Sequence, residues 1–288
     1  MTMRPDIVPV AAVTARPVTP MFRIPPAIRK QGHIVLVIAS TEFKLKYTDS
    51  ALGYVWSLAK PLGLFGMLYL VFGHVFRLNG GIEHYTLYLL LGIVLWTFLA
   101  DATKIGLRSV VDRATLISKL SFPRLIVPLS VTLSSALTLC INLVTIAVFI
   151  AFNRIVPGTR WLLLLPLLLE LYLVALGLSL ILSALYVRFR DVEPVWELAL
   201  QILFYASPII YPVALLPYWF KPIAFLSPFV QIIQDARSIV VPSKASVTAA
   251  TIYGSPFGEL LPIGVGLVLL VGGYLLFRRE QPFFAERT

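Results

Sequence analysis

The sequence predicts an all-α integral membrane protein with six transmembrane helices. Of its 288 residues, 58% are apolar and 13% are charged, and the mean hydropathy is +0.88. A typical soluble domain carries about 25% charged residues. The composition therefore excludes a soluble enzyme and a disordered chain. Apolar runs of about 20 residues, the length that crosses a hydrocarbon core, recur along the chain.

The chain begins with two segments that are not expected to cross the membrane. Residues 1–24 hold several prolines and no apolar core of signal-peptide length, so we expect a flexible cytoplasmic tail. Residues 27–48 are predicted to form an amphipathic helix along the inner surface, with Glu42 and Lys46 as an i,i+4 pair. Its apolar stripe holds Ile34, Ile38 and Leu45. A plain membrane anchor explains this pattern equally well.

Six spans follow from the apolar runs. They cover residues 54–76, 85–107, 125–152, 161–187, 195–215 and 258–278. Lys60 interrupts the first span and is expected to reach the inner interface with its charged end. Glu170 is the one charge in the fourth span, and Pro208 and Pro212 break the fifth. We treat residues 25–288 as one transmembrane domain.

The distribution of cations predicts the orientation. With the N-terminus in the cytoplasm, 18 of the 24 Lys and Arg residues lie in inner segments and 6 in outer ones. This bias satisfies the positive-inside rule, and six spans then place both termini in the cytoplasm. Because topology explains most of the net charge of +10, no nucleic-acid partner is expected.

Two segments between spans are unusual. Residues 109–122 are predicted to form a short cytoplasmic helix, which is suited to docking a soluble partner or to serving as a solvated connector. Its apolar face holds Leu116, Ile117 and Leu120. On the outer side, prolines divide an apolar, aromatic segment into two short helices, about 217–227 and 229–240. Both are expected to re-enter the membrane, where irregular backbone needs protein or a water-filled cavity beside it. A surface-lying aromatic loop is the alternative.

Polar groups that carry out chemistry are sparse. Cys140 is the one cysteine, and the three histidines have no partner at metal-ligand spacing, so no metal site and no catalytic residue is predicted. Gly-Lys does not occur, so the phosphate-binding loop of ATPases is absent. Asp101 and Lys104 are three residues apart and can pair along one helix. Glu170 is deep in its span, and such a carboxylate is either functional or hydrogen-bonded within the bundle.

Aromatic residues are abundant, with 18 Phe, 12 Tyr and 5 Trp. Their faces stack on the C–H faces of sugars, so a row of them could carry a glycan. Interfacial belts and ordinary packing are the competing explanation. The candidate channel residues are Tyr69, Phe72, Trp96, Phe98, Tyr172, Tyr205, Ser207 and Tyr211.

Five strings in order resemble the ABC-2-type permeases that export polysaccharides, such as O-antigen and teichoic-acid exporters. The strings lie at residues 43–61, 119–129, 186–192, 207–212 and 227–237. The resemblance implies a homodimer in the plasma membrane that moves a lipid-linked polysaccharide outward among membrane lipids. It also implies two copies of a separate ATPase subunit that hold ATP and Mg, with no cofactor on this chain.

The resemblance also implies residue roles. The residues expected to couple to the ATPase are Arg113, Leu116, Ile117, Lys119, Leu120, Phe122, Arg188, Arg190 and Asp191. The surface helix and the start of the first span would receive the lipid-linked glycan through Arg29, Lys30, Lys44, Lys46, Trp56 and Lys60. The outer gate would hold Tyr218, Trp219, Phe225 and Phe229.

The cargo is left open. The Ala-, Val-, Arg- and Pro-rich tail suits a high-GC actinobacterial source, for which a galactan precursor on a polyprenyl diphosphate is the narrower expectation. One alternative is a related permease that exports a drug or lipid. A second is a polytopic enzyme acting on lipid-linked sugars, which would need clustered carboxylates or basic residues at an interface.

Overall fold

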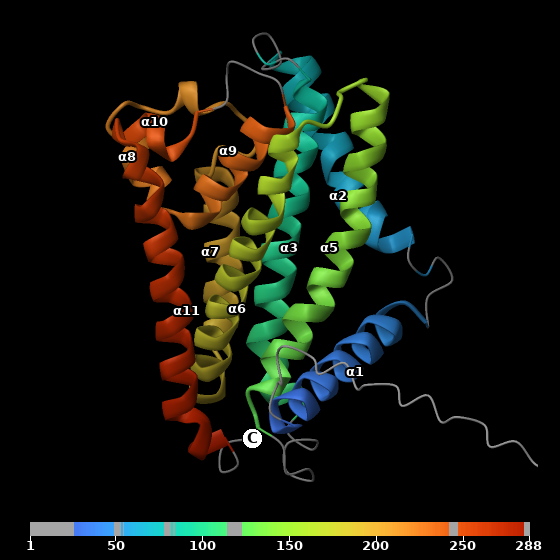
Figure 1. The fold of residues 1–288 in the computed structure, drawn as a ribbon, viewed down its shortest axis with the longest axis vertical. Coiled ribbons are helices and arrows are strands. Elements are labelled where there is room, and N and C mark those ends of the chain that lie inside the picture. The colour runs from blue at the N-terminus through green and yellow to red at the C-terminus, as the bar shows by residue number, and fades with distance from the viewer. Residues whose placement is uncertain are drawn as a thin grey trace, which may run out of the picture.

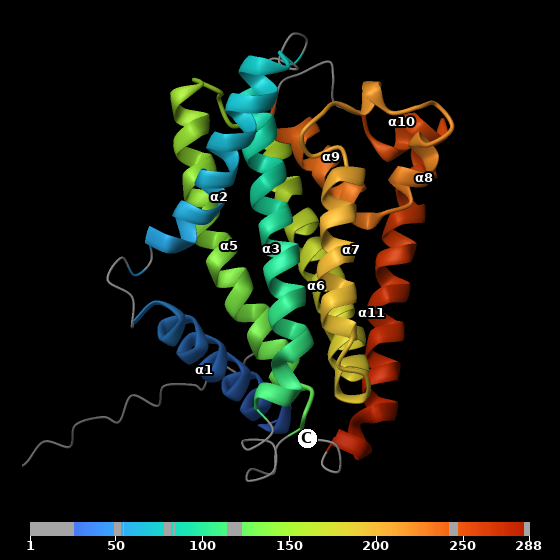
Figure 2. The same ribbon diagram turned by 180° about the vertical axis from the view of Figure 1, so that it is seen from behind.

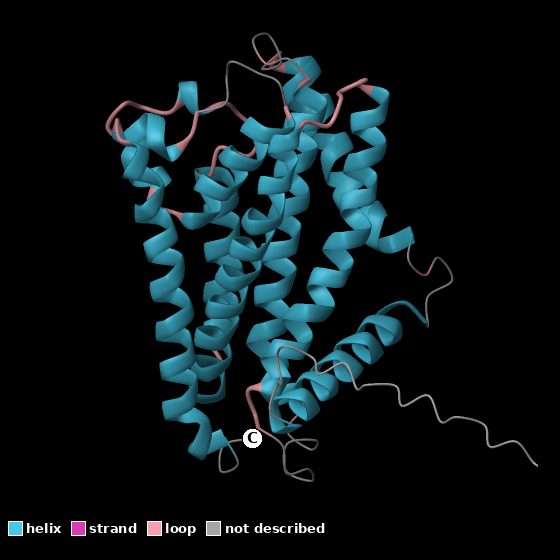
Figure 3. Ribbon diagram, viewed as in Figure 1, coloured by secondary structure: helices cyan, strands magenta, loops and turns pink. Residues whose placement is uncertain are grey.

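The computed structural model describes residues 26–48, 53, 55–77, 82, 84–113, 123–241 and 247–284, except the side chains of 26–30 and Tyr47. Over these residues every regular element is a helix and no strand forms (Figure 3). The predicted all-α class is therefore confirmed. The predicted tail over 1–24 and residues 114–122 of the predicted coupling helix lie outside the described residues.

Five helical stretches of the described chain are long and apolar enough to cross a membrane, and they match the predicted first, second, third, fourth and sixth spans. The first, Val55–Val75, consists of α2 (Val55–Leu68) and the π-helix η1 (Tyr69–Val75); the next two are α3 (Tyr85–Asp112) and α5 (Ile126–Phe152). The fourth, Thr159–Arg188, consists of η2 (Thr159–Leu163) and α6 (Leu164–Arg188). The last, Pro256–Phe283, consists of η4 (Pro256–Glu259), α11 (Leu260–Glu280) and η5 (Gln281–Phe283).

The fifth predicted span is not one helix. Helix α7 covers Val192–Ala206, so its 15 residues reach only about 22 Å. The break expected at Pro208 is present, and the helical part of the predicted span over 195–215 ends at Ala206. Ser207 is extended, at φ −80° and ψ 140°, because the ring of Pro208 disfavours helical geometry in the preceding residue. The six-span count is thus not confirmed by helix length.

Four short helices cap the bundle above α7 and α11 (Figure 1). They are η3 (Val213–Leu215), α8 (Lys221–Phe225), α9 (Pro228–Val240) and α10 (Ala249–Tyr253). Helices α8 and α9 lie within the two predicted outer helices. Pro222 and Pro228 occupy their first turns, where the missing N–H of proline removes no helical hydrogen bond.

Helix α3 is the centre of the bundle. Of its most apolar window 78% is buried, against 22% for α2 and α11. Helices α6 and α11 meet at glycines: a Cβ atom on Gly273 would overlap the carbonyl of Gly177, and one on Gly177 would lie 2.8 Å from the backbone of Leu270. Small residues at such a contact let two membrane helices approach backbone to backbone.

Helix α1 (Pro26–Thr48) runs obliquely across the end of the bundle opposite the outer cap and packs against α5 (Figure 1). Its packed face is centred on Val35 and Ala39, which are buried. Ile34 and Ile38 of the predicted stripe lie beside them and are half-buried, whereas Leu45 is 60% exposed. The length of the helix is as predicted. The periodicity of α1 does not reveal that α5 covers this face.

The inner end of α3 differs from the prediction. Residues 109–112 continue α3 instead of starting a separate helix, because Ser109 and Val110 are buried against the bundle and no Gly or Pro interrupts the run. Arg113 follows the helix and donates to Glu42 of α1, with 3.0 Å from Nε to Oε1 and 2.7 Å from an Nη to Oε2. This bidentate pair fastens α1 to the end of α3.

Candidate functional site

A groove runs along one face of the bundle, over α3 and between α2 and α7, which stand on either side of α3 in Figure 2. Two adjoining hollows of about 310 and 360 Å³ form it and share Lys104 and Glu197. The residues that line it are Lys60, Leu64, Trp96, Thr97, Ala100, Asp101, Lys104, Ile105, Leu107, Arg108, Asp112, Glu193, Trp196, Glu197, Leu200, Gln201, Phe204 and Tyr205. Charged groups and aromatic rings thus share one surface.

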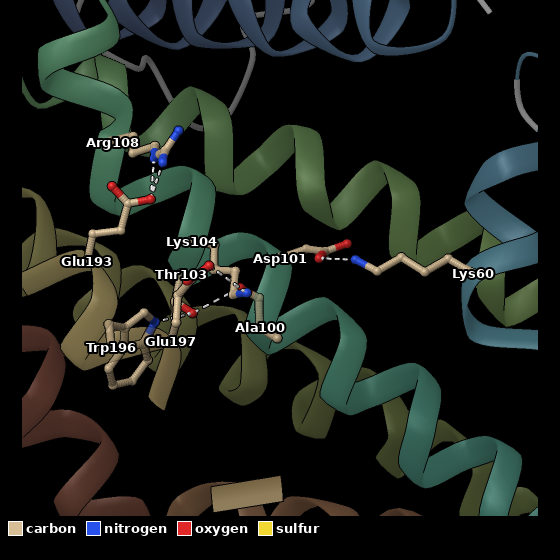
Figure 4. A network of polar contacts seen from close by, with 9 residues as sticks. All are labelled: Lys60, Ala100, Asp101, Thr103, Lys104, Arg108, Glu193, Trp196 and Glu197. Atoms are coloured by element: carbon tan, nitrogen blue, oxygen red, sulfur yellow. Dashed lines mark hydrogen bonds and ion pairs between the residues drawn. The ribbon is translucent and has the colours of Figure 1, made fainter. Parts of the chain in front are cut away.

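Three ion pairs cross the groove from α3 (Figure 4). Lys60 of α2 lies 2.7 Å from Asp101, measured from Nζ to Oδ1. Lys104 lies 3.2 Å from Glu197 of α7, and Arg108 donates to Glu193 through two nitrogens. The three α3 residues share one helix face because they are three and four positions apart.

These pairings differ from the predicted link between Asp101 and Lys104. Each residue instead pairs with an opposite charge on a neighbouring helix. Lys60 is 66% exposed and Glu197 is 52% exposed. Exposed ion pairs contribute only about 0–1 kcal/mol, so they can exchange partners with a polar ligand at little cost.

Helix α7 is held on α3 and α6 by hydrogen bonds at its inner end. Trp196 Nε1 donates to Thr103 Oγ1 at 3.1 Å, and the Tyr186 hydroxyl donates to Glu193 at 3.1 Å. Glu193 also accepts from Arg108, so ion pairs and hydrogen bonds together fix this end of the groove.

The predicted channel aromatics separate into two groups. Trp96 and Tyr205 line the groove; Tyr205 is 64% exposed, whereas Trp96 is 7% exposed and belongs also to the main apolar core. Phe98 and Ser207 are buried in the bundle. The Tyr211 hydroxyl donates to the carbonyls of Tyr205 and Ala206, at 2.9 and 3.3 Å, and so caps the end of α7.

The remaining channel candidates pack within the bundle or at its edge. Tyr69 stacks between Phe65 and Tyr85, with ring centroids 5.7 and 6.3 Å apart. Phe72 stacks on Phe76 at 5.5 Å. Tyr172 packs against the main apolar core. None of these three lines the groove in the described structure.

The residues expected to receive the glycan partly come together. Lys46, Trp56 and Lys60 line a further hollow of about 250 Å³, which also contains Asp101. Lys44 is exposed on α1. Arg29 and Lys30 lie in α1, but their side chains are outside the described part of the structure.

The coupling residues that are described lie at the same end of the bundle as α1. The guanidinium groups of Arg188 and Arg190 lie over the rings of Phe189 and Tyr186, at 5.1 and 4.9 Å from the centroids. Asp191 is exposed in the turn before α7. Five further coupling candidates fall outside the described residues: Leu116, Ile117, Lys119, Leu120 and Phe122.

Of the four predicted outer-gate residues, two are exposed and two are buried. Tyr218 and Trp219 are 90% and 70% exposed, so they lie at the surface of the outer cap. Phe225 and Phe229 are buried, and Phe229 packs on Trp96 with ring centroids 5.1 Å apart. Phe229 therefore connects the outer cap to a groove residue.

Sequence reasoning missed the organising role of Arg237. Its side chain is fully buried, and it donates to the carbonyls of Tyr88, Pro208 and Ile209 at 2.6–3.1 Å. Its Cζ lies 3.4 Å from the centroid of the Tyr88 ring. Arg237 thereby joins α9, the break after α7, and α3. The signal for this role was an arginine in an apolar helix that also holds buried amides.

Comparison with known proteins shows the family of the chain. The family model described as "ABC-2 type transporter" matches residues 34–241. Two proteins named O-antigen export system permease protein RfbA, both from Klebsiella pneumoniae, are 30% and 29% identical over 255 residues, covering 88% of this chain and 94% of each relative. A protein of the same name from Myxococcus xanthus is 25% identical over 279 residues, covering 92% and 99%. The chain is a multi-pass membrane protein of the ABC-2 type transporter family.

Proposed function

We propose that this chain is the permease subunit of an ABC transporter that moves a lipid-linked polysaccharide to the outer face of the plasma membrane. The observation that carries the proposal is the groove, in which exposed ion pairs adjoin Trp96, Phe204 and Tyr205. The names of the relatives, which are O-antigen export permeases, support this class of cargo. A galactan precursor is the narrower prediction.

The chemistry of the groove suits a sliding glycan. Aromatic faces hold the C–H faces of sugar rings without fixing one position along the polymer. Exposed carboxylates and ammonium groups, such as Glu197 and Lys104, exchange their mutual contacts for sugar hydroxyls at low cost. A surface of this kind favours passage over tight binding.

We further propose six crossings, with both termini in the cytoplasm. Helix α7 begins at the same end as the turn after α6, and α8 and α9 continue from its outer end to the cap (Figure 1). In this scheme the fifth crossing consists of α7 and the irregular chain beyond Ala206. The re-entrant α8 and α9 close its outer half, and the bias of Lys and Arg toward inner segments supports the orientation.

The proposed assembly is a homodimer with two copies of a cytoplasmic ATPase subunit, which bind ATP and Mg. The ends of α3 and α6, the start of α7, and α1 gather at one end of the bundle, which suits a docking face (Figure 2). Lys60 and Tyr205 of the groove are exposed, so a second copy packed over them would complete a closed channel. No catalytic role is assigned to this chain.

The proposal is tested by export into proteoliposomes that contain the chain with its co-purified ATPase. Trp96→Ala and Tyr205→Ala should each slow translocation by about three- to tenfold, taking one ring–sugar contact to be worth as much as an aromatic pair, about 0.5–1.5 kcal/mol. Tyr274→Ala is the matched control, since Tyr274 is a partly exposed tyrosine on α11, outside the groove. Unchanged export in both groove variants would refute the glycan path. Failure of any ATPase to co-purify would refute the assembly.

A further inference from the structure

A second polar hollow lies on a different face of the bundle, between α6, α9 and α11. It has a volume of about 380 Å³ and is separate from the groove over α3. Helix α6 lies in front of α7 in Figure 1 and behind it in Figure 2, and α11 forms the edge of the bundle in both views. The lining residues are Arg160, Leu163, Pro166, Leu167, Glu170, Gln231, Asp235, Ser238, Ile239, Thr248, Glu259 and Ile263. The proposed export path uses none of them.

Three buried oxygens of this hollow accept no hydrogen bond in the described structure: Glu170 Oε1, Gln231 Oε1 and Asp235 Oδ1. The side chain of Gln231 is 1% exposed and that of Asp235 is 8% exposed. The Gln231 amide nitrogen already donates to the other oxygen of Asp235. Buried acceptors without a donor are rare in native proteins, so this set indicates a missing donor.

The charge of the hollow specifies a cation. Three acidic residues, Glu170, Asp235 and Glu259, line the hollow, and Arg160 is the one basic residue among its lining. Within the described chain none of the three carboxylates joins an ion pair. The described residues hold no group of three or more His, Cys, Asp or Glu placed to bind a metal ion. A primary ammonium group has three N–H donors, which equals the number of unpartnered acceptors.

An apolar slot continues from the polar hollow. It has a volume of about 230 Å³ and shares Pro166, Glu170 and Ile263 with that hollow. Its other walls come from both α6 and α11: Leu169, Leu173, Val174, Gly266, Leu267 and Leu270. A ligand that fills both spaces has a cationic head and an apolar chain that lies along two membrane-spanning helices.

From these contacts we propose that the hollow binds the headgroup of a primary-amine phospholipid such as phosphatidylethanolamine. The ammonium group donates to Glu170, Gln231 and Asp235, and Arg160 at the rim pairs with the phosphate. One acyl chain lies in the slot between α6 and α11. The inference concerns a structural lipid and holds for any exported cargo.

Native mass spectrometry of the full chain, purified with its partners and supplied with single lipids, tests the proposal. Phosphatidylethanolamine should be retained, whereas phosphatidylcholine, whose ammonium has no N–H, and phosphatidylglycerol should not. Glu170→Gln and Asp235→Asn should each weaken retention about tenfold, since each removes a charge-assisted hydrogen bond. Glu280→Gln, on the inner end of α11, is the matched control and should retain the lipid.

Two further arms separate the lipid from a soluble amine. Leu267→Trp, at an exposed position of the slot, should release phosphatidylethanolamine although no polar contact is lost. Free phosphoethanolamine should compete only at far higher concentration than the intact lipid. Equal retention of phosphatidylcholine, normal retention in Glu170→Gln, or equally strong competition by free phosphoethanolamine would each overturn the proposal. If the carboxylate variants fail to fold, the lipid comparison and Leu267→Trp still decide.

Discussion

Replacing Arg237 should loosen the outer half of the bundle more than any other single polar substitution we consider. The guanidinium makes four hydrogen bonds to three carbonyls. Two of these carbonyls, of Pro208 and Ile209, lie in the non-helical turn after α7. In Arg237→Met the Ile209 carbonyl loses its guanidinium donor, and the Pro208 carbonyl keeps only the long 3.5 Å bond from the Gln234 amide. An unsatisfied buried acceptor costs about 1–3 kcal/mol. We expect a net loss of about 4 kcal/mol of unfolding free energy.

Thermal unfolding of the detergent-solubilised chain, followed by size-exclusion chromatography, measures this loss. A change of about 4 kcal/mol should lower Tm by roughly 8 °C or more. Arg237→Lys should recover less than half of the loss, because one ammonium group cannot reproduce the planar fork that reaches α3 and the turn together.

A second perturbation reaches the same site from α3. A Cβ atom on Gly92 would lie 2.6 Å from an Arg237 nitrogen and 3.2 Å from Ile209, so Gly92→Ala should displace the guanidinium and lower Tm. Gly264→Ala is the matched control, since nothing lies within 4 Å of that position. A normal Tm in both Arg237→Met and Gly92→Ala would refute the assigned role of the arginine.

Three further predictions test other contacts. Gly273→Ala should push α6 and α11 apart and lower the free energy of unfolding by about 1–3 kcal/mol through overpacking. Gly272→Ala has open space at its Cβ and should not lower Tm. Equal effects of the two variants on Tm would contradict the glycine contact. Arg113→Glu and Glu42→Arg should each detach α1, and the double variant should restore its protection from limited proteolysis; no rescue would argue against the pair. Leu116→Glu should separate ATP hydrolysis from export without lowering Tm, and coupled export would show that docking occurs elsewhere.

Local sequence signals predicted the helices well. A span depends on an uninterrupted apolar run, so α5 and α6 begin and end within a few residues of their predicted limits. Proline marked the outer helices for the same reason, since its effect on the backbone is confined to its neighbours. The end of α7 is predicted in part. Pro208 indicates a break in the fifth span, and the structure shows that the helix already ends before Ser207.

Contacts between distant residues were not accessible to this reasoning. Asp101 meets Lys60 across 41 positions, and Arg237 meets Tyr88 across 149. Periodicity tells which residues share a face but not which helix covers that face, so the packing of α1 on α5 was also missed. Glu170 was singled out as deep and functional or hydrogen-bonded, but only the fold places Gln231 and Asp235 in the same hollow.

The π-helical turn that ends the first span has a mechanical consequence. Over Tyr69–Val75 the chain bonds five residues apart, as the 3.0 Å bond from the Phe76 amide to the Val71 carbonyl shows. Returning such a segment to α geometry slides the helix on one side by about 1.5 Å and rotates it by about 100° per residue of slip. In the most apolar window of α2 and η1 only 22% of the residues are buried, so little packing resists that screw motion. The motion would carry Lys60 away from Asp101 and widen the groove on the α2 side alone.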